Sequence, residues 1–172
     1  MHDGGKQFEP LNIAILTVSD TRTFAEDTSG DYLQESLLKA GHNLYERKLC
    51  TDHLYDIRAI VSQWIADKAC QVVIITGGTG FYDKDITPEA VTILFDKTVD
   101  GFGEVFRQCS QNTVQLSTIQ SRAVAGVANR TLIFAIPGST GACKTAWGDI
   151  LENQLDARTK PCNFVPHVRF IK

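Results

Sequence analysis

The sequence predicts a three-layer α/β/α sandwich built around a mainly parallel sheet. Strand-like runs alternate with helix-like amphipathic segments along the chain, which is the pattern of α/β folds. Three strand-like runs are apolar almost throughout, as expected of strands that are buried on both faces of a sheet. These runs are residues 12–18 (NIAILTV), 70–75 (CQVVII) and 131–136 (TLIFAI). We therefore expect helices on both faces of this sheet.

Between the first two apolar runs the sequence predicts two helices and a weaker strand. The first helix covers residues 31–40, and Gly41 is a suitable left-handed residue to end it. Residues 43–49 form the weaker strand, whose charges favour a position near the sheet edge. The second helix has apolar residues at i, i+3, i+4, i+7 and i+8, all on one face: Ile57, Ile60, Val61, Trp64 and Ile65.

After the 70–75 strand we expect a helix with Thr87 as its N-cap, Pro88 at its first position and Glu89 in its first turn. A short helix over residues 101–109 is expected to follow. Its predicted buried side chains are Phe102, Val105 and Phe106.

The last part of the chain contains one more strand and one long helix. Residues 121–128 are small and apolar, and we expect them to form a further helical turn. The 131–136 strand follows, and the final helix covers residues 141–155. The predicted buried face of that helix consists of Ala146, Trp147, Ile150, Leu151 and Leu155.

Length and composition fit a single globular domain. The chain has 172 residues, of which 43% are hydrophobic and 22% charged, and such a length can bury a substantial core. We expect a flexible N-terminal segment over residues 1–10, the α/β domain over 11–160 and its C-terminal tail over 161–172. The net charge of −3 gives no overall attraction to nucleic acid or to an anionic membrane, so neither is an expected partner.

The cysteines indicate a reducing compartment. Their number, five, is odd, their spacing is wide, and the sequence has no C-x-x-C pair, so a disulfide framework or zinc site is not expected. The first residues lack the apolar stretch of a signal peptide. No apolar run approaches the roughly 20 residues that span a bilayer. A cytoplasmic protein is the resulting expectation.

Three loops that follow apolar strands are the candidates for function. They contain Ser19-Asp20-Thr21-Arg22, Thr76-Gly77-Gly78-Thr79-Gly80 and Pro137-Gly138-Ser139-Thr140. In open parallel sheets, ligands bind beyond the carboxyl ends of the strands. We therefore expect these loops to converge on one side of the sheet.

The TGGTG loop is the strongest of the three signals. Gly77, Gly78 and Gly80 can adopt positive φ and place no side chain between backbone and ligand. Their consecutive N–H groups can then point into one concavity that suits a phosphate, with the hydroxyls of Thr76 and Thr79 as additional donors. Alternatively, the glycines only make a tight turn between strand and helix.

Two common nucleotide-binding fingerprints do not fit this loop. A Walker A motif is excluded because no Gly-Lys-Ser/Thr follows at the required spacing, and Asp83 occupies the position of the last glycine in G-x-G-x-x-G. Asp85 or Asp83 can still hold Mg²⁺ together with phosphate oxygens. Lys84 can instead neutralise phosphate directly, although charged loop residues are usually just solvated. Asp52 is a second candidate acid, with helix N-capping as its alternative role.

The other two loops offer anion contacts. Arg22 can grip an anionic group bidentately, and either Thr28 or Ser29 is expected to cap the following helix. Gly138 and Ser139 provide a close backbone approach and a hydroxyl at a helix N-terminus, a favourable site for an anion. The alternative for this last loop is a simple helix start.

Six segments form a specific pattern: IAILTVSDTR, DTSG, VVIITGGTGFYDKDITPEA, GFGEVFR, SRAVAGVANRTLIFAIPGST and LDARTKPCNFVPH. Together they resemble the MoaB/MogA family of molybdenum cofactor biosynthesis proteins over residues 11–167. GGTG followed by D-x-T-P-E is specific for this family and its gephyrin-like and MoeA-like relatives. The SRAVAGVANRTLIFAIPGS block and the ARTKPCNFVPH tail favour the MoaB branch.

This resemblance implies a molybdopterin-binding domain that forms trimers, or hexamers of paired trimers. Active family members transfer AMP from Mg-ATP to the terminal phosphate of molybdopterin, and the product passes to a MoeA-like insertase. Asp52 and Asp85 are then the expected catalytic and Mg²⁺-binding residues. The expected substrate and phosphate contacts are Ser19, Asp20, Arg22, Thr76, Gly77, Gly78, Thr79, Gly80, Pro137, Gly138 and Ser139.

The chain departs from its active relatives at two positions. Thr140 replaces the proline that many of them carry in a Pro-Gly-x-Pro loop, and Lys84 stands where arginine is frequent. Two main hypotheses follow, because fold analogy alone does not decide function, and a plain nucleotide-binding interaction module is the least favoured third. One is a molybdopterin adenylyltransferase, favoured by the presence of both Asp52 and Asp85. The other is a non-catalytic protein that binds or delivers the pterin, favoured by Thr140 and the MoaB-type tail.

Overall fold

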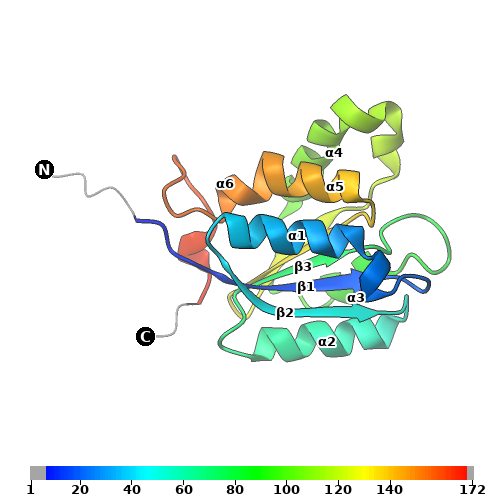
Figure 1. The fold of residues 1–172 in the computed structure, drawn as a ribbon, viewed down its shortest axis with the longest axis horizontal. Coiled ribbons are helices and arrows are strands. Elements are labelled where there is room, and N and C mark those ends of the chain that lie inside the picture. Colours follow the sequence, from blue (N-terminus) through cyan, green and yellow to red (C-terminus); the bar gives the residue numbers. More distant parts are fainter. Residues whose placement is uncertain (1–6, 170–172) are drawn as a thin grey trace, which may run out of the picture.

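The structure is a computed structural model that describes residues 7–169. The expected flexible segment, residues 1–10, falls mostly outside the described residues, as do the last three residues of the expected tail. Within the described range, the predicted α/β/α sandwich is confirmed (Figure 1). None of the helices described there is long and apolar enough to cross a membrane.

The described residues form a six-stranded sheet with the order β2-β1-β3-β6-β5-β4. β1 pairs in parallel with β2 and β3, and β3 pairs in parallel with β6, so the central part is parallel as predicted. β5 is antiparallel to both of its neighbours. The strands are β1 (Asn12–Val18), β2 (Asn43–Cys50), β3 (Val72–Thr76), β4 (Lys97–Thr98), β5 (Val124–Ala128) and β6 (Thr131–Ile136). The charged strand β2 is at one edge, where its sequence placed it.

The predicted helical turn at 121–128 is wrong, because Val124–Ala128 forms strand β5. Asn129 and Arg130 both have positive φ, 48° and 64°, and such two-residue turns join antiparallel strands into hairpins. Close packing explains why this segment contains small residues. A Cβ on Gly126 would lie 2.2 Å from the ring of Phe95, so the ring occupies the space of the missing side chain.

Helices cover both faces of the sheet. The described helices are α1 (Thr28–Lys39), α2 (Leu54–Ala66), α3 (Thr87–Thr92), α4 (Asp100–Val114), α5 (Thr140–Thr145) and α6 (Glu152–Gln154), with a π-turn, η3 (Ala146–Leu151), between the last two. Short 3-10 turns are η1 (Phe24–Glu26), η2 (Gln115–Gln120) and η4 (Val165–His167). α1, α4 and α5 lie on one face, and α2 lies on the other (Figure 1).

The alternation of side chains along β1 divides the core into two. Ile13 and Ile15 pack with α1, α4 and η3, whereas Ala14 and Leu16 pack with α2 and α3. Both sets are fully buried. This two-sided burial explains why β1 reads as an uninterrupted apolar run.

Helix boundaries differ from the predictions at a few positions. Asp27, not Thr28 or Ser29, caps α1, since its side chain accepts from the Gly30 N–H. Ile86 precedes α3, and Thr87 is already inside it. α4 continues to Val114, and the predicted burial of Val105 is wrong, because this side chain is 43% exposed. Gly41 has φ +94° and confirms the predicted end of α1.

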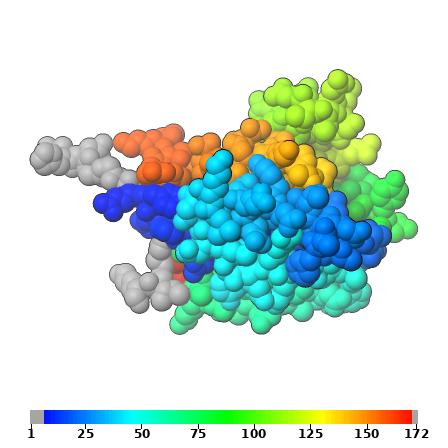
Figure 2. All heavy atoms as spheres, in the orientation of Figure 1, coloured from blue at the N-terminus to red at the C-terminus, as the bar shows by residue number. Residues whose placement is uncertain are grey.

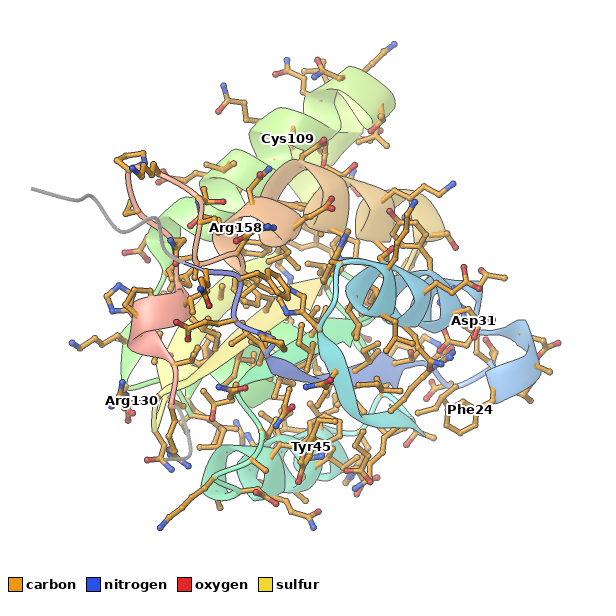
Figure 3. The ribbon with its side chains drawn as sticks, turned by 60° about the vertical axis from the view of Figure 1, so that its left-hand side comes forward. Phe24, Asp31, Tyr45, Cys109, Arg130 and Arg158 are labelled. Atoms are coloured by element: carbon orange, nitrogen blue, oxygen red, sulfur yellow. The ribbon has the colours of Figure 1, made fainter. Side chains whose placement is uncertain are left out.

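Asp27 also joins α1 to the sheet through a buried ion pair. Its carboxylate lies 2.8 Å from the Arg47 Nη2 of β2 and accepts from the Thr17 hydroxyl at 2.7 Å. Arg47 also pairs with the exposed Asp31 and lies over the ring of Phe24. Figure 3 labels both of these partners, Asp31 and Phe24. Burial alone raises the pKa of Asp27, but the bonds from Thr17 and Arg47 outweigh it and hold the pKa below its ordinary value.

Asp27→Asn should lower the free energy of unfolding at pH 7 by on the order of 3 kcal/mol, because it breaks a buried ion pair. The depressed pKa means that the unfolded chain takes up this proton first as pH falls. The parent should therefore lose stability below about pH 4, and the variant should show a shallower loss. Urea unfolding between pH 7 and pH 3 measures both effects.

Asp31→Asn is the matched control for this measurement, since it removes the half-exposed partner of the same arginine. It should cost less than about 1 kcal/mol. Equal losses in the two variants would contradict the assignment of Asp27 as the stabilising partner.

Candidate functional site

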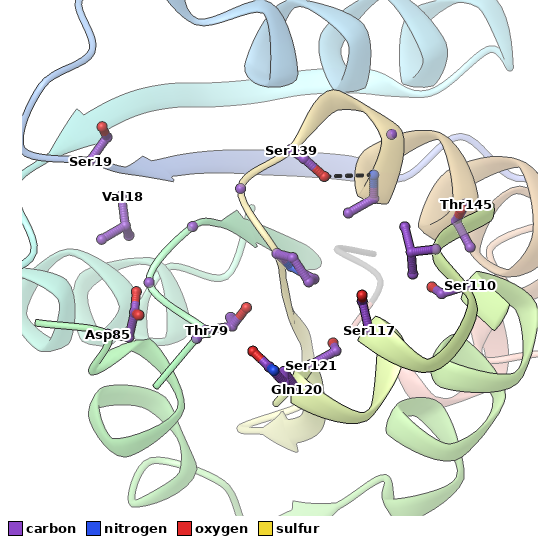
Figure 4. Close-up of a pocket in the computed structure, with 18 of the residues that line it drawn as sticks. Val18, Ser19, Thr79, Asp85, Ser110, Ser117, Gln120, Ser121, Ser139 and Thr145 are labelled. Carbon is purple, nitrogen blue, oxygen red and sulfur yellow. Dashed lines mark hydrogen bonds between the residues drawn. The ribbon is translucent and has the colours of Figure 1, made fainter. Parts of the chain in front are cut away.

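A cavity of about 710 Å³ opens at the carboxyl ends of β1, β3 and β6 (Figure 4). This volume lies within the range of small-molecule sites. The three predicted loops do converge here. The cavity lining includes Ser19, Asp20, Arg22, Asp52, Gly77, Gly78, Thr79, Gly80, Asp85, Pro137, Gly138 and Ser139. Of the expected catalytic, metal-binding and substrate-binding residues, Thr76 is absent from this lining, and so is Asp83, the alternative acid for Mg²⁺.

Gly77 is the point where the three loops touch. Its φ is +112°, and a Cβ would lie 2.1 Å from the carbonyl oxygen of Val18. On the other side, a Cβ on Gly138 would lie 3.2 Å from the Gly77 Cα. The Gly77 N–H donates to Ile136 O at 3.0 Å. This glycine therefore has the structural role of a tight turn and close approach, the alternative considered above.

The next two glycines place carboxylates against the loop. A Cβ on Gly78, whose φ is +64°, would lie 3.1 Å from Asp52 Oδ1. A Cβ on Gly80 would lie 2.6 Å from Asp85 Oδ2, the oxygen that accepts from the Tyr82 N–H at 2.9 Å. The two candidate acids thus flank the same loop. Their separation in sequence does not reveal this arrangement.

Asp20 and Lys84 add a linked pair of charges. The Asp20 carboxylate accepts from the Asp52 N–H at 2.9 Å and from Lys84 Nζ at 3.2 Å. These two bonds, the first being the stronger influence, hold the pKa of Asp20 below its usual value. For Asp52, burial and then the negative charge of Asp20 raise the pKa. Asp52 does not cap α2, because His53 is the residue that precedes this helix.

The loop that contains Gly138 is held by the side chains of Arg22 and Ser29. Arg22 Nη1 and the Ser29 hydroxyl each donate to Gly138 O at 2.8 Å. One donor of the Arg22 fork is therefore used for positioning. The Ser139 oxygen accepts from the Ala142 N–H at 3.1 Å and caps α5, which is the helix-start alternative (Figure 4).

Thr76 lies beneath the cavity and is fully buried. Its hydroxyl donates to Pro137 O at 3.1 Å and lies 3.3 Å from Cys143 Sγ. It therefore links two loops from below. Burial raises the pKa of the Cys143 thiol, so this cysteine is not an activated nucleophile.

The sequence did not single out the wall opposite the glycine loop. α4 and η2 form this wall, which Figure 2 shows as part of a projection from the molecule. It brings hydroxyl and amide side chains to the cavity: Ser110, Thr113, Ser117, Thr118, Gln120 and Ser121. One signal was present, because residues 108–121 contain no charged residue.

Arg122, also not predicted, clamps the glycine loop. Its Nε donates to Gly80 O at 2.9 Å and its Nη2 to Asp85 O at 2.5 Å. Its Nη1 pairs with Glu89 of α3, and its guanidinium lies 5.4 Å from the centre of the Phe81 ring. One side chain thus fixes both ends of the Gly80–Asp85 segment.

The chain is similar to known proteins over nearly its whole length. The family described as "Probable molybdopterin binding domain" matches residues 14–157. Molybdenum cofactor biosynthesis protein B of Escherichia coli (strain K12) is 57% identical over 163 residues, which cover 95% of this chain and 96% of that protein. The Bacillus subtilis (strain 168) protein of the same name is 39% identical and covers 82% and 84% of the two chains.

Solved structures agree with this similarity. A crystal structure of a molybdenum cofactor biosynthesis protein B superposes with a TM-score of 0.84 at 36% identity, over 87% of this chain and 94% of that one. The tungsten cofactor synthesizing protein MoaB from Pyrococcus furiosus gives a TM-score of 0.74 at 33% identity, over 84% and 92%. The resemblance found in the sequence, including the MoaB branch, is confirmed.

Arg122→Gln should loosen the glycine loop, because it removes the fork that holds two of its carbonyls. We expect backbone amides of residues 80–85 to exchange hydrogen about tenfold faster or more, since local opening costs less free energy. Hydrogen exchange read by mass spectrometry measures this change. Arg58→Gln is the matched control, because Arg58 also donates to two carbonyls, those of Glu89 and Ala90, away from the loop. Unchanged exchange in the Arg122 variant would contradict the clamp.

Proposed function

Since this chain belongs to the family of molybdenum cofactor biosynthesis proteins with a molybdopterin-binding domain, we propose that it binds molybdopterin and transfers AMP to it from Mg-ATP. The observation that supports this proposal best is the pair of carboxylates, Asp52 and Asp85, placed against the glycines of a phosphate-type loop. A protein that only bound a pterin would not need two acids there.

The proposed reaction joins two phosphates. An oxygen of the molybdopterin phosphate attacks the α-phosphorus of ATP, the new P–O bond forms, and the bond to the departing pyrophosphate breaks. Both reactants are anions, so fixed donors must offset their charge. The loop N–H groups of Gly78 to Gly80 and the ammonium group of Lys84 supply positive potential at the cavity.

Mg²⁺ fits this donor set. Asp52 and Asp85 would hold it together with substrate phosphate oxygens, the kind of coordination that this ion prefers. When bound, it neutralises charge on the reacting phosphates. Among residues 7–169, no three His, Cys, Asp or Glu side chains are grouped so that they could hold a metal ion by themselves. In the proposal, the phosphates therefore complete the coordination.

Thr140 does not weaken the enzyme hypothesis. Its hydroxyl is 2.9 Å from the Thr28 hydroxyl and 3.3 Å from that of Ser29. These bonds restrain the loop at the position where many relatives carry a rigid proline. The non-catalytic binding protein remains the second candidate, and the assay below separates the two.

Purified protein with molybdopterin, ATP and Mg²⁺ should yield AMP-pterin and pyrophosphate. Asp85→Asn should lower kcat by about 100-fold or more, as expected when a group that acts on the transition state is removed. Its fold should be intact, because Asn can still accept the Tyr82 N–H. Asp83→Asn is the matched control, since Asp83 is exposed, lies two residues away and is absent from the cavity lining.

If the parent binds molybdopterin but forms no AMP-pterin, the binding and delivery role replaces the enzymatic one. If the Asp83 and Asp85 variants lose activity equally, Asp85 has no special role.

We also propose that the protein works in the cytoplasm as a trimer or hexamer that passes its product to a MoeA-like insertase. Leu116, Ile119 and Ile93 are 79%, 77% and 69% exposed, and such apolar side chains are available for subunit contacts. Sedimentation at micromolar concentration should give an assembly of three or six chains. A monomer would contradict this assembly.

A further inference from the structure

Three buried side-chain atoms within residues 7–169 lack a hydrogen-bond partner: Arg47 Nε, Ser121 Oγ and Thr87 Oγ1. Arg47 uses its other two nitrogens in ion pairs, and Ser121 borders the cavity. Thr87 differs from both, because the whole residue is buried and the hydroxyl is the only polar group of its side chain. Buried hydroxyls in folded proteins nearly always have a partner, so the unpaired hydroxyl of Thr87 needs an explanation.

Helix capping does not explain this hydroxyl. The sequence predicted Thr87 as the N-cap of α3, but Ile86 precedes the helix and no side chain caps it. The main-chain N–H of Thr87 instead donates to Gly78 O at 2.9 Å. Thr87 is therefore held directly behind the glycine loop, although it is absent from the cavity lining.

The space of a missing side chain lies between the Thr87 hydroxyl and the Asp52 carboxylate. A Cβ on Gly78 would lie 2.4 Å from Thr87 Oγ1 and 3.1 Å from Asp52 Oδ1. The absence of a side chain at Gly78 therefore leaves the path between the two oxygens open. Asp85, the other candidate Mg²⁺ ligand, accepts from the Tyr82 N–H at 2.9 Å. Thr87 is placed to do the same for Asp52.

We propose that Thr87 is a positioning residue, whose hydroxyl donates across this gap to the Asp52 carboxylate and fixes it for Mg²⁺. The inference rests on the proposed function and adds a residue that does not touch the substrate. Carboxylates that bind metal ions are themselves held by hydrogen bonds from groups behind them. A hydroxyl can donate, and an ionised carboxylate only accepts. Only the side chain of Asp52 has to turn, because its main-chain N–H is anchored by Asp20 at 2.9 Å.

A role in the fold alone makes the opposite prediction for stability. A buried hydroxyl without a partner destabilises the folded chain, because it has lost its bonds to water. Thr87→Val replaces this hydroxyl with a methyl group of the same shape. The thermal unfolding midpoint of the variant should therefore equal or exceed that of the parent. A hydroxyl that stabilised the fold would instead give a lower midpoint in the valine variant.

The test measures binding of α,β-methylene-ATP, which cannot be cleaved at the α-phosphorus, to the full chain by calorimetry, with Mg²⁺ and with EDTA. Thr87→Val should lower the affinity about tenfold or more with Mg²⁺, as expected when a metal ligand loses its supporting bond. With EDTA the affinity should change less than about twofold. Thr87→Ser keeps the hydroxyl and should bind like the parent under both conditions. Thr92→Val, an exposed threonine of α3 outside the cavity, is the matched control.

Three results overturn the inference: an unchanged affinity of Thr87→Val with Mg²⁺, equal losses in the valine and serine variants, or a lower unfolding midpoint in the valine variant. The proposed function stands in each of these cases, provided that the parent still forms AMP-pterin. If Mg²⁺ does not raise the affinity of the parent for the nucleotide, the inference fails together with the Mg²⁺ site of the proposed function.

Discussion

The close packing of three backbones at Gly77 is the constraint on which the cavity depends. The carbonyl of Val18 occupies the space of a Gly77 side chain, and Gly138 approaches from the other side. Any side chain at Gly77 would separate β1 from the β3 loop. With these loops in contact, Asp52 from the loop after β2 faces the same volume as Lys84 and Asp85 from the loop after β3. The proposed phosphate site therefore depends on this backbone contact as well as on the charged side chains.

Much of the fold could be predicted from the sequence because the central strands are buried on both faces. β1 and β6 have the bounds that were predicted for them, since continuous apolar runs leave little ambiguity. The segment 121–128 was mispredicted because alanine and glycine carry no strong periodicity. Its strand identity depends on the turn at Asn129 and on the Phe95 ring above Gly126, which are tertiary facts.

The site could be predicted where glycine and proline mark the ends of strands. It could not be predicted where the fold brings in residues that are distant in sequence. Gly78 and Asp85 stood out because loops after buried strands are the usual places for ligands. Ser110 and Arg122 did not, because serine and arginine are common on helices and surfaces and nothing in their local pattern refers to a distant loop. Only the packing of α4 over the sheet brings Ser110 to the cavity, and only the fold places Arg122 against the glycine loop.

The reversed direction of β5 decides which residues of the chain lie near the cavity. In a wholly parallel sheet, every strand presents its last residues at the ligand edge, and its first residues lie at the far edge. β5 runs the other way, with Val124 beside Ala135 near the end of β6. Its leading residues, Ser121 and Arg122, therefore arrive where its neighbours finish. Because this one strand is inverted, the ligand edge of the sheet receives side chains that precede a strand as well as side chains that follow one.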